Sequence, residues 1–384
     1  MERLRCVPVD GSPERVDELV AAVDAALGGG PPVLPVGPGA SVTPAAEPEP
    51  GTALVIATSG STGGPKLVVL PAAALRASAL ATAQRLGGRA RWLLALPAEH
   101  VAGVQVIVRA LLAGRPPVVQ DVRGGFRPEG FAAATAELGD GRRCTSLVPT
   151  QLGRLLDAGR AGLDALRSYD GVLVGGAALD PGLHARAGAA GVRVVTTYGM
   201  SETSGGCVYD GVPLADVRVD LGADGRIRLG GPTLAGGYLG DPERTADVFA
   251  DGWFRTDDLG RWRDGRLEVL GRADDVINTG GEKVAPAAVE RVLGAEPGVR
   301  AACVVGLPDA EWGQVVAAAV VLRPGDPVDE NRLRSAVRAA LGRAAVPRVV
   351  RGVDEIPLRG VGKPDRAAVA RLLADVRHPG RELP

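Results

Sequence analysis

The chain has 384 residues, which exceeds one ordinary domain of roughly 150 residues and predicts two or three domains. Hydrophobic residues make up 46% and charged residues 23%, as in globular proteins, so extensive disorder is excluded. The 44 basic and 45 acidic residues give a formal net charge of -1. This balance provides no global attraction to nucleic acid or to an anionic membrane, and we expect a small-molecule partner.

The cysteines indicate a reducing environment. Cys6, Cys144, Cys207 and Cys303 lie far apart and form no C-x-x-C pair, which argues against a zinc site or a disulfide framework. We therefore expect a cytoplasmic protein. The first twenty residues are rich in charge and contain no apolar segment typical of a signal peptide. The longest apolar runs, such as Val315–Leu322, are shorter than the roughly 18 residues of a membrane span, so none is expected.

The first predicted helix follows Ser12, a residue type that caps helices, and starts with Pro13. Its apolar residues recur at helical spacing as far as Leu27, where three glycines end it. Residues 37–51 are rich in Gly and Pro and predict an exposed connector.

Short β-branched runs then alternate with helical patterns up to about residue 200. This alternation predicts βαβ units and a layered α/β domain. The predicted strands are Ala53–Ala57, Leu67–Leu70, Trp92–Leu96, Val118–Gln120, Thr145–Val148, Val172–Val174 and Val192–Thr196, with helices such as Ala72–Leu86, Val101–Ala113 and Pro181–Ala190 between several of them.

Turn signals crowd the segment after about residue 206, and helical patterns vanish there. A compact β subdomain is predicted for about 206–271. The expected organisation is a large layered N-terminal α/β domain over residues 1–271, which includes this subdomain, and a small α+β C-terminal domain over residues 272–384. The main elements predicted in the small domain are helices Asp329–Leu341 and Asp365–Val376 and strands Ala301–Val305 and Val315–Leu322.

The segment Thr58–Lys66 (TSGSTGGPK) directly follows the predicted strand Ala53–Ala57. Its glycines allow backbone N–H groups to turn toward one anion, its hydroxyls add donors, and Lys66 adds a compact positive charge. This chemistry suits a polyphosphate. A Walker A loop would need Gly-Lys followed by Ser or Thr, whereas Pro65 precedes and Leu67 follows the lysine. A Gly/Ser linker is the alternative, although linkers rarely follow a buried strand.

Two later segments carry candidate chemistry. Tyr198–Glu202 follows the predicted strand Val192–Thr196, at the sheet edge where α/β folds bind ligands. Its aromatic ring, glycine and carboxylate suit a nucleotide with its metal, and an exposed turn is the alternative. Lys363 lies in a glycine-rich run before the helix predicted at Asp365, so a loop presents it. A lone lysine on a loop is usually just solvated.

In this order, these segments resemble the acyl-adenylate-forming superfamily of AMP-binding enzymes, which includes acyl-CoA synthetases, peptide-synthetase adenylation domains and luciferases. The similarity covers residues 50–370. Besides the loop at Thr58–Lys66, it rests on Gly175–Ala177, Tyr198–Thr203, Phe254–Asp258, Gly271–Asp275, Gly280–Val284 and Gly362–Lys363.

The resemblance implies an ATP site. Tyr198 would stack on adenine, Asp258 and Arg272 would reach the ribose, and Glu202 would help to hold Mg²⁺. A carboxylate can accept from both ribose hydroxyls, and Mg²⁺ takes oxygen ligands. The ATP-binding residues that the resemblance implies are Thr58, Ser59, Gly60, Ser61, Thr62, Gly63, Lys66, Gly175, Gly176, Ala177, Tyr198, Ser201, Asp258 and Arg272.

The same resemblance implies catalytic and moving parts. Lys363 would bridge the acyl carboxylate and the phosphate during adenylation. Asp274 falls at the hinge of a mobile C-terminal domain, and Gly280 and Gly281 would line the passage for the pantetheine of CoA. His100 lies where acyl-CoA synthetases often have a residue that gates the acyl carboxylate site. A helix-capping or core histidine is the alternative reading of His100.

The short region before the phosphate loop, and the segments 97–103, 148–152 and 207–214, most resemble o-succinylbenzoate–CoA ligases of menaquinone synthesis. The implied reaction forms an acyl-adenylate and pyrophosphate from ATP and a carboxylic acid, and the CoA thiolate then displaces AMP. Mg²⁺, ATP and CoA are the expected cofactor and co-substrates, and a homodimer is left open. A ligase for another small aromatic acid, or an adenylating enzyme that loads a carrier protein, remains an alternative. A non-catalytic nucleotide-binding module would be expected to lack Lys363 or Glu202.

Overall fold

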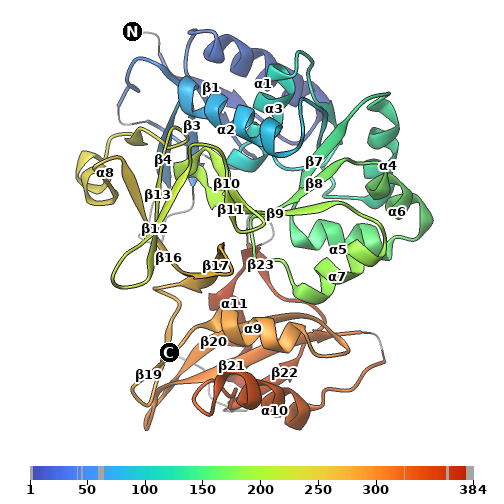
Figure 1. Ribbon diagram of the computed structural model, residues 1–384, viewed down its shortest axis with the longest axis vertical. Coiled ribbons are helices and arrows are strands. Elements are labelled where there is room, and N and C mark those ends of the chain that lie inside the picture. Colours follow the sequence, from blue (N-terminus) through green and yellow to red (C-terminus); the bar gives the residue numbers. More distant parts are fainter. Residues whose placement is uncertain are drawn as a thin grey trace.

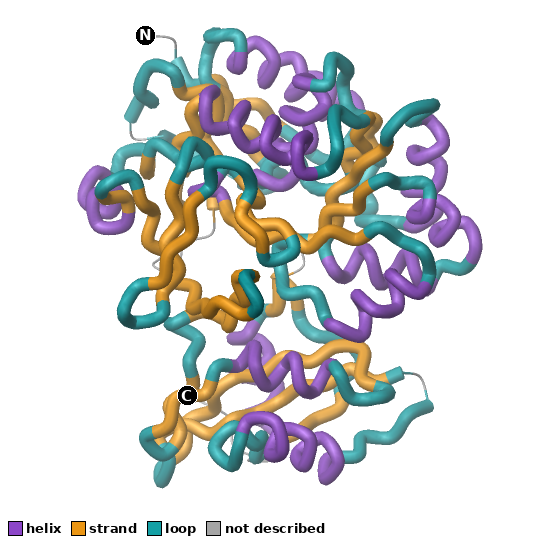
Figure 2. The backbone as a smooth tube through the Cα atoms, in the orientation of Figure 1, coloured by secondary structure: helices purple, strands orange, loops and turns teal. Residues whose placement is uncertain are grey.

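The structure is a computed structural model, and it describes residues 3–40, 42–44, 46–58, 65–323, 325–359 and 363–377. This part of the chain forms a large N-terminal α/β domain and a smaller C-terminal domain, as predicted (Figure 1). In both domains the helices lie against the sheets (Figure 2). None of the helices in these ranges combines the length and the apolar character needed to span a membrane.

The first helix begins where its capping residue predicts. Helix α1 spans Pro13–Leu27, and the Ser12 hydroxyl accepts a hydrogen bond of 3.3 Å from the Arg15 N–H. This bond satisfies one of the N–H groups that the first turn leaves without a helical partner. The apolar side of α1, including Leu19 and Val23, packs in the core of the N-terminal domain.

A five-stranded sheet carries the ends of the predicted phosphate loop. Its order is β1-β2-β3-β4-β14, with the first three strands parallel and the last two antiparallel to their neighbours. The predicted strand at 53–57 and that at 67–70 are thus the two arms of one hairpin. The strands are β1 (Arg5–Pro8), β2 (Val33–Val36), β3 (Thr52–Thr58), β4 (Lys66–Pro71) and β14 (Gly237–Tyr238).

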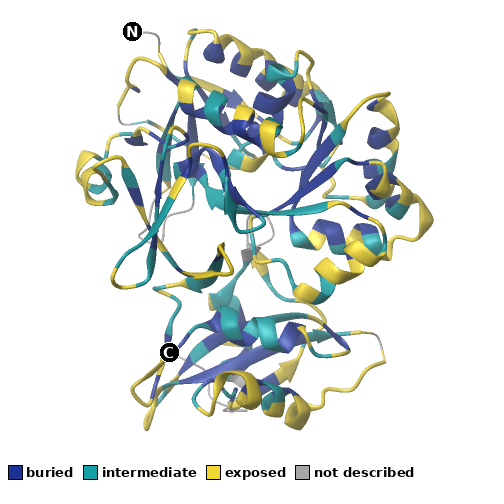
Figure 3. Ribbon diagram, in the orientation of Figure 1, coloured by how far each residue is buried: buried dark blue, intermediate teal, exposed yellow. Residues whose placement is uncertain are grey.

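A seven-stranded sheet in the order β11-β10-β9-β8-β7-β5-β6 forms the centre of the domain. Strands β5 to β9 run parallel, as the βαβ pattern predicts. Helices cover both faces, because strand side chains alternate: Leu94 packs with α1, α2 and α3, whereas Leu93 packs with α4 to α7 (Figure 3). The strands are β5 (Arg91–Leu94), β6 (Val118–Val119), β7 (Arg143–Leu147), β8 (Gly171–Val174), β9 (Val194–Met200), β10 (Gly205–Tyr209) and β11 (Val212–Pro213). The helices are α2 (Ala72–Arg85), α3 (Val101–Leu112), α4 (Pro128–Glu137), α5 (Pro149–Asp157), α6 (Arg160–Arg167) and α7 (Pro181–Ala189).

The segment expected to be a β subdomain divides between three sheets. Strands β10 and β11 extend the seven-stranded sheet, and β14 joins β4. The remaining strands form a five-stranded antiparallel sheet: β12 (Arg218–Leu221), β13 (Arg226–Gly230), β15 (Phe249–Ala250), β16 (Trp253–Arg263) and β17 (Arg266–Arg272). The expected absence of helices is wrong, because α8 occupies Pro242–Val248 behind an Asp241 cap.

The C-terminal domain has a five-stranded sheet, and its two longest strands, β20 and β21, pair antiparallel. One face packs against α9 and α10, and the other packs against α11. A separate two-stranded hairpin, β23–β24, precedes α11. The elements are β18 (Ile277–Thr279), β19 (Glu282–Val284), α9 (Pro286–Gly294), β20 (Val299–Asp309), β21 (Gly313–Leu322), α10 (Glu330–Leu341), β22 (Val349–Gly352), β23 (Leu358–Arg359), β24 (Lys363–Pro364) and α11 (Arg366–Arg377).

Candidate active site

Tyr198 and Asp258, which are 60 residues apart in the chain, lie side by side. The Tyr198 hydroxyl donates a hydrogen bond of 2.7 Å to Asp258 Oδ2. Burial and the neighbouring carboxylate raise the pKa of Tyr198, so the hydroxyl stays protonated. The prediction that Tyr198 follows its strand is wrong: β9 continues to Met200, because β10 folds back beside it and pairs Val208 with Tyr198.

Arg272 lies among the acidic side chains beside Asp258. Strands β16 and β17 pair Asp258 with Arg272, and the guanidinium lies 4.0 Å from the Asp258 carboxylate. It lies 2.7 Å from Asp274 and 3.3 Å from Asp257. These carboxylates, above all Asp274 through its hydrogen bond, raise the pKa of Arg272. The expected ribose residues and the expected hinge residue are therefore in one cluster.

Glu202 belongs to a second cluster, which contains a residue that the sequence analysis missed. Tyr238 donates a hydrogen bond of 2.8 Å to Glu202 Oε1. Lys66 Nζ lies 5.5 Å from the centroid of the Tyr238 ring, and the Arg244 guanidinium carbon lies 5.7 Å from it. The sequence signal for it is the short run Gly236–Tyr238, which lies among the turn signals after residue 206. Burial and Glu202 raise the pKa of Tyr238, so it remains a donor.

The two ends of the predicted phosphate loop are fixed beside this cluster. Thr58 and Lys66 pair across β3 and β4, and the Thr58 hydroxyl lies 3.4 Å from the Lys66 carbonyl oxygen. The short strand β14, which ends in Tyr238, pairs with β4. The other predicted loop residues, Ser59, Gly60, Ser61, Thr62 and Gly63, lie outside the described residues.

Gly175, Gly176 and Ala177 follow the carboxyl end of β8. They lie at the edge of the seven-stranded sheet where the parallel strand β9 also ends. A Cβ atom at Gly175 would lie 2.3 Å from Thr197 Oγ1, so a larger residue there would have to displace Thr197. Gly176 has φ +80°, which a residue with a side chain rarely adopts.

Two more predicted residues lie near the ends of β5 and β9. His100 occupies the position before α3, without capping the helix through its side chain. The turn that presents it is tight, because a Cβ atom at Gly103 would lie 2.2 Å from the Pro97 carbonyl oxygen. Ser201 is buried at the start of a single 3₁₀ turn, Ser201–Thr203, that carries Glu202.

The predicted residues of the C-terminal domain lie at two different places. The backbone of Lys363 begins β24 and pairs with Arg359, in a hairpin that Figure 1 shows between the two domains. Gly280 and Gly281 form the turn between β18 and β19, with φ +58° and +85°. This turn lies away from β23 (Figure 1), so the structure does not bring it to the ATP residues.

The three buried thiols of the protein are poor nucleophiles. Burial raises the pKa of Cys144, Cys207 and Cys303 to about 12. Cys6 is exposed, and none of the four forms a disulfide. The described ranges also contain no group of three or more His, Cys, Asp or Glu side chains that could hold a metal alone.

Two parts of the chain match models of one protein family. Residues 8–239 match the family described as AMP-binding enzyme, and residues 288–363 match its C-terminal domain. The chain belongs to the AMP-binding enzyme family. The membership predicted from the order of the motifs is confirmed.

The names of relatives in the family refer to different acids. A Mycobacterium tuberculosis protein named probable 2-succinylbenzoate–CoA ligase is 50% identical over 327 residues, which cover 84% of this chain and 85% of that protein. A feruloyl-CoA synthase from an Amycolatopsis species is 34% identical over 346 residues, covering 83% of this chain and 69% of that protein.

Solved structures share the fold. The amide bond synthetase McbA from Marinactinospora thermotolerans aligns with a TM-score of 0.77 at 30% identity, over 96% of this chain and 79% of that chain. The o-succinylbenzoate CoA synthetase MenE from Bacillus subtilis aligns with a TM-score of 0.75 at 24% identity, over 96% of this chain and 88% of that chain.

Proposed function

We propose that this protein is an ATP-dependent 2-succinylbenzoate–CoA ligase that works through an acyl-adenylate. The observation that carries the proposal is its 50% identity to the mycobacterial protein of that name over most of both chains. The carboxylate of the acid attacks the α-phosphorus of ATP and displaces pyrophosphate. The thiolate of CoA then attacks the acyl carbon and displaces AMP. CoA supplies the sulfur nucleophile, and the buried cysteines of the protein take no part.

The cluster around Tyr198 suits the nucleoside of ATP. Asp258 has two carboxylate oxygens for the ribose hydroxyls, and its side chain is only 16% exposed, so these bonds would form largely out of water. Tyr198 donates to the same carboxylate, which fixes its ring beside the ribose. Arg272 neutralises Asp258 from the other side. Gly175, where a Cβ atom would meet Thr197, and Gly176, whose φ is positive, would let the adenine approach the backbone.

The cluster around Glu202 suits the triphosphate and its Mg²⁺. Tyr238 holds Glu202 Oε1, and this orients the carboxylate as one ligand of the ion. Mg²⁺ commonly binds one or two carboxylates together with substrate phosphates and water. Lys66, beside the same tyrosine ring, supplies positive charge at the phosphate loop.

The scarcity of lysine supports the roles of Lys66 and Lys363. Among 44 basic residues only Lys66, Lys283 and Lys363 are lysines, and all three lie in motifs assigned to ATP or CoA. The other basic residues of the chain are all arginines. A compact ammonium differs from a planar guanidinium in reach and in hydration. We assign to Lys363 the bridging of the acyl carboxylate and the α-phosphate during adenylation.

A rotation of the C-terminal domain would separate the two steps. We place the boundary between residues 271 and 272 and the hinge at Asp274, between β17 and β18. In the present orientation β23–β24 faces the N-terminal domain and the Gly280–Gly281 turn lies away from it (Figure 1). The opposite orientation would withdraw Lys363 and bring the glycine turn to the pantetheine passage. Gating of this kind is a general catalytic device.

The unpaired cysteines fit a cytoplasmic location.

The experiment is a competition between acids. Purified protein with ATP, Mg²⁺ and CoA should use 2-succinylbenzoate with a specificity constant at least 100-fold above those of benzoate, ferulate and a fatty acid. A site built to pair a second carboxylate rejects acids that lack it, because its polar groups are then left unpaired. Equal use of benzoate or ferulate would reject the substrate and leave the adenylation chemistry standing. AMP release that needs a carrier protein instead of CoA would reject the ligase assignment.

A further inference from the structure

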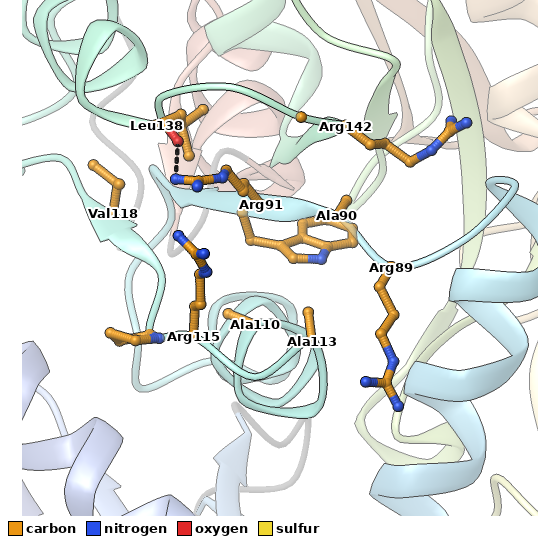
Figure 4. A pocket seen from close by; sticks show the side chains of 12 residues that line it. Arg89, Ala90, Arg91, Ala110, Ala113, Arg115, Val118, Leu138 and Arg142 are labelled. Atoms are coloured by element: carbon orange, nitrogen blue, oxygen red, sulfur yellow. Dashed lines mark hydrogen bonds between the residues drawn. The ribbon is translucent and has the colours of Figure 1, made fainter.

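A pocket of about 230 Å³ lies at the edge of the seven-stranded sheet opposite to the candidate active site. It is built from the segments that precede β5, β6 and β7, and these strands run parallel. Their amino ends therefore form this edge, whereas His100 and Gly175 follow carboxyl ends at the other. Figure 4 shows its arginines around an opening walled by small apolar side chains. The polar lining consists of Arg89, Arg91, Arg115 and Arg142, and the apolar lining includes Ala90, Trp92, Ala110, Ala113, Val118 and Leu138.

The lining is strongly positive, although the chain as a whole carries a net charge of -1. No aspartate or glutamate belongs to it. Arg91 donates to the Leu138 carbonyl at 2.5 Å, and Arg142 donates to the Leu86 carbonyl at 2.9 Å and lies 3.9 Å from Asp170. Arg89 and Arg115 are exposed, and among the described residues their guanidinium groups have no hydrogen-bond or ion-pair partner. Two guanidinium groups at the rim are thus available to an anion.

A buried arginine lies beneath this pocket. A smaller hollow of about 20 Å³ shares Arg89 and Trp92 with the pocket and reaches Arg109, which is 7% exposed. Arg109 Nη2 donates to the Tyr209 hydroxyl at 3.2 Å, and its guanidinium carbon lies 5.3 Å from the centroid of the Trp92 ring. Its Nε finds no hydrogen-bond partner, and no carboxylate of a described residue lies within ion-pair distance.

These observations point to an anion as occupant. A buried cation without a counter-charge is unfavourable, and a nearby anion reduces that penalty. Guanidinium groups bind phosphate and carboxylate in bidentate fashion. The volume is below the roughly 300–1,000 Å³ of pockets for drug-sized ligands, which excludes a nucleotide. Ala110, Ala113 and Val118 offer an apolar wall to the uncharged part of the ligand.

We propose that this pocket is a second ligand site, for a small dianion with an apolar body of about one aromatic ring. An aryl phosphate and an aromatic dicarboxylate share this chemistry. The site is separate from the proposed reaction, because the sheet lies between the pocket and the ATP residues. Its occupant would contact Arg89 and Arg115 at the rim and draw on the positive charge of Arg109 below.

Isothermal titration of the full chain tests the proposal, with phenyl phosphate and phthalate as separate probes and phenol as the uncharged comparator. We expect at least one dianion to bind and phenol not to bind. The double variant R89Q/R115Q should bind that probe at least tenfold more weakly, because each charged hydrogen bond contributes substantially. A matched variant, R338Q/R343Q, removes two exposed arginines of the C-terminal domain and should bind like wild type. R89K/R115K should retain part of the affinity.

The preferred probe identifies the source of the ligand, since phenyl phosphate stands for phosphate monoesters and phthalate for dicarboxylates. ATP at ten times its dissociation constant, without acid substrate, should leave binding unchanged. Displacement by ATP would place the probe in the active site and overturn the proposal. Absence of binding by both dianions, or equal affinity in wild type and R89Q/R115Q, would overturn it too. The single variant R115Q supplies the same comparison if the double variant does not fold.

Discussion

Tyr238 joins the predicted metal ligand to the phosphate loop. Its hydroxyl holds Glu202 at 2.8 Å, while its ring lies under Lys66 and Arg244. The variant Tyr238→Phe removes the hydroxyl and keeps the ring. We expect the KM for Mg²⁺-ATP to rise about tenfold with a small change in kcat, because a hydrogen bond to a charged group contributes roughly 1.5–3 kcal/mol. Initial rates over a series of Mg²⁺-ATP concentrations measure it.

The control for this variant is Tyr169→Phe. Tyr169 is also buried, and its hydroxyl lies 2.8 Å from the Thr135 hydroxyl in the core against α4. Its loss should lower stability by about 1 kcal/mol and leave the KM for ATP unchanged. Tyr238→Phe with wild-type ATP kinetics at limiting Mg²⁺ would show that the tyrosine does not position Glu202.

Single residues could be predicted from the sequence where a motif carries them, but their partners could not. Tyr198 and Asp258 were each assigned to the nucleotide, yet their hydrogen bond depends on how β9 and β16 approach, which no local pattern encodes. Tyr238 was missed because its motif is short and its partners, Glu202 and Lys66, are distant in sequence. The contacts of the loop residues Ser59–Gly63 remain predictions.

At the level of elements, local signals located helices and long-range pairing decided strands. Helix α1 starts and ends as predicted, because its signals are local: Ser12 and Pro13 act on the first turn, and Gly28 acts on the last turn. Strand β9 runs four residues beyond the expected Thr196, since β10 gives it a partner that is visible only after the chain folds back. Helix α8 was overlooked among turn signals, although Asp241 and Pro242 form a typical helix start.

Helix α3 connects several parts of the N-terminal domain. It begins after His100, and Gln105 on it donates to the Ser204 carbonyl at 2.7 Å. Arg109, one turn later, donates to Tyr209. The position of α3 depends on Gly103, where no side chain fits against the Pro97 carbonyl.

The variant Gly103→Ala tests this dependence. A Cβ atom 2.2 Å from the Pro97 oxygen must displace the turn that presents His100. We expect a loss of about 1–3 kcal/mol in the free energy of unfolding, typical of overpacking, and a raised KM for the acid. Gly188→Ala in α7 is the control: no atom lies within 4 Å of its Cβ, so alanine should be neutral or slightly stabilising. Denaturant unfolding and acid kinetics measure both effects. Equal stability of the two variants would show that α3 shifts without cost.

At the level of the whole molecule, two ion pairs away from the hinge connect the two domains. Arg291 on α9 lies 2.6 Å from Glu268 on β17, and Arg300 on β20 lies 2.9 Å from Asp157 on α5. Hydrogen bonding from Arg261, assisted by Arg291, lowers the pKa of Glu268, so this carboxylate stays charged. The sequence predicted two domains and a hinge, but not this orientation, because the pairing charges are ordinary surface residues until the domains meet.

The double variant R291Q/R300Q should separate the two half-reactions. Both pairs are partly exposed, so each contributes at most about 1 kcal/mol. Their loss should shift the population away from the orientation in which β23–β24 faces the N-terminal domain, and adenylate formation should slow about two- to fivefold. Thioester formation from preformed acyl-adenylate should be unchanged or faster, since it uses the other orientation. Single-turnover measurements of each step test this.

The control R15Q/R123Q removes ion pairs within α1 and within one loop, and should change neither step. Equal slowing of both steps in R291Q/R300Q would mean that these pairs stabilise the fold and have no part in choosing the orientation.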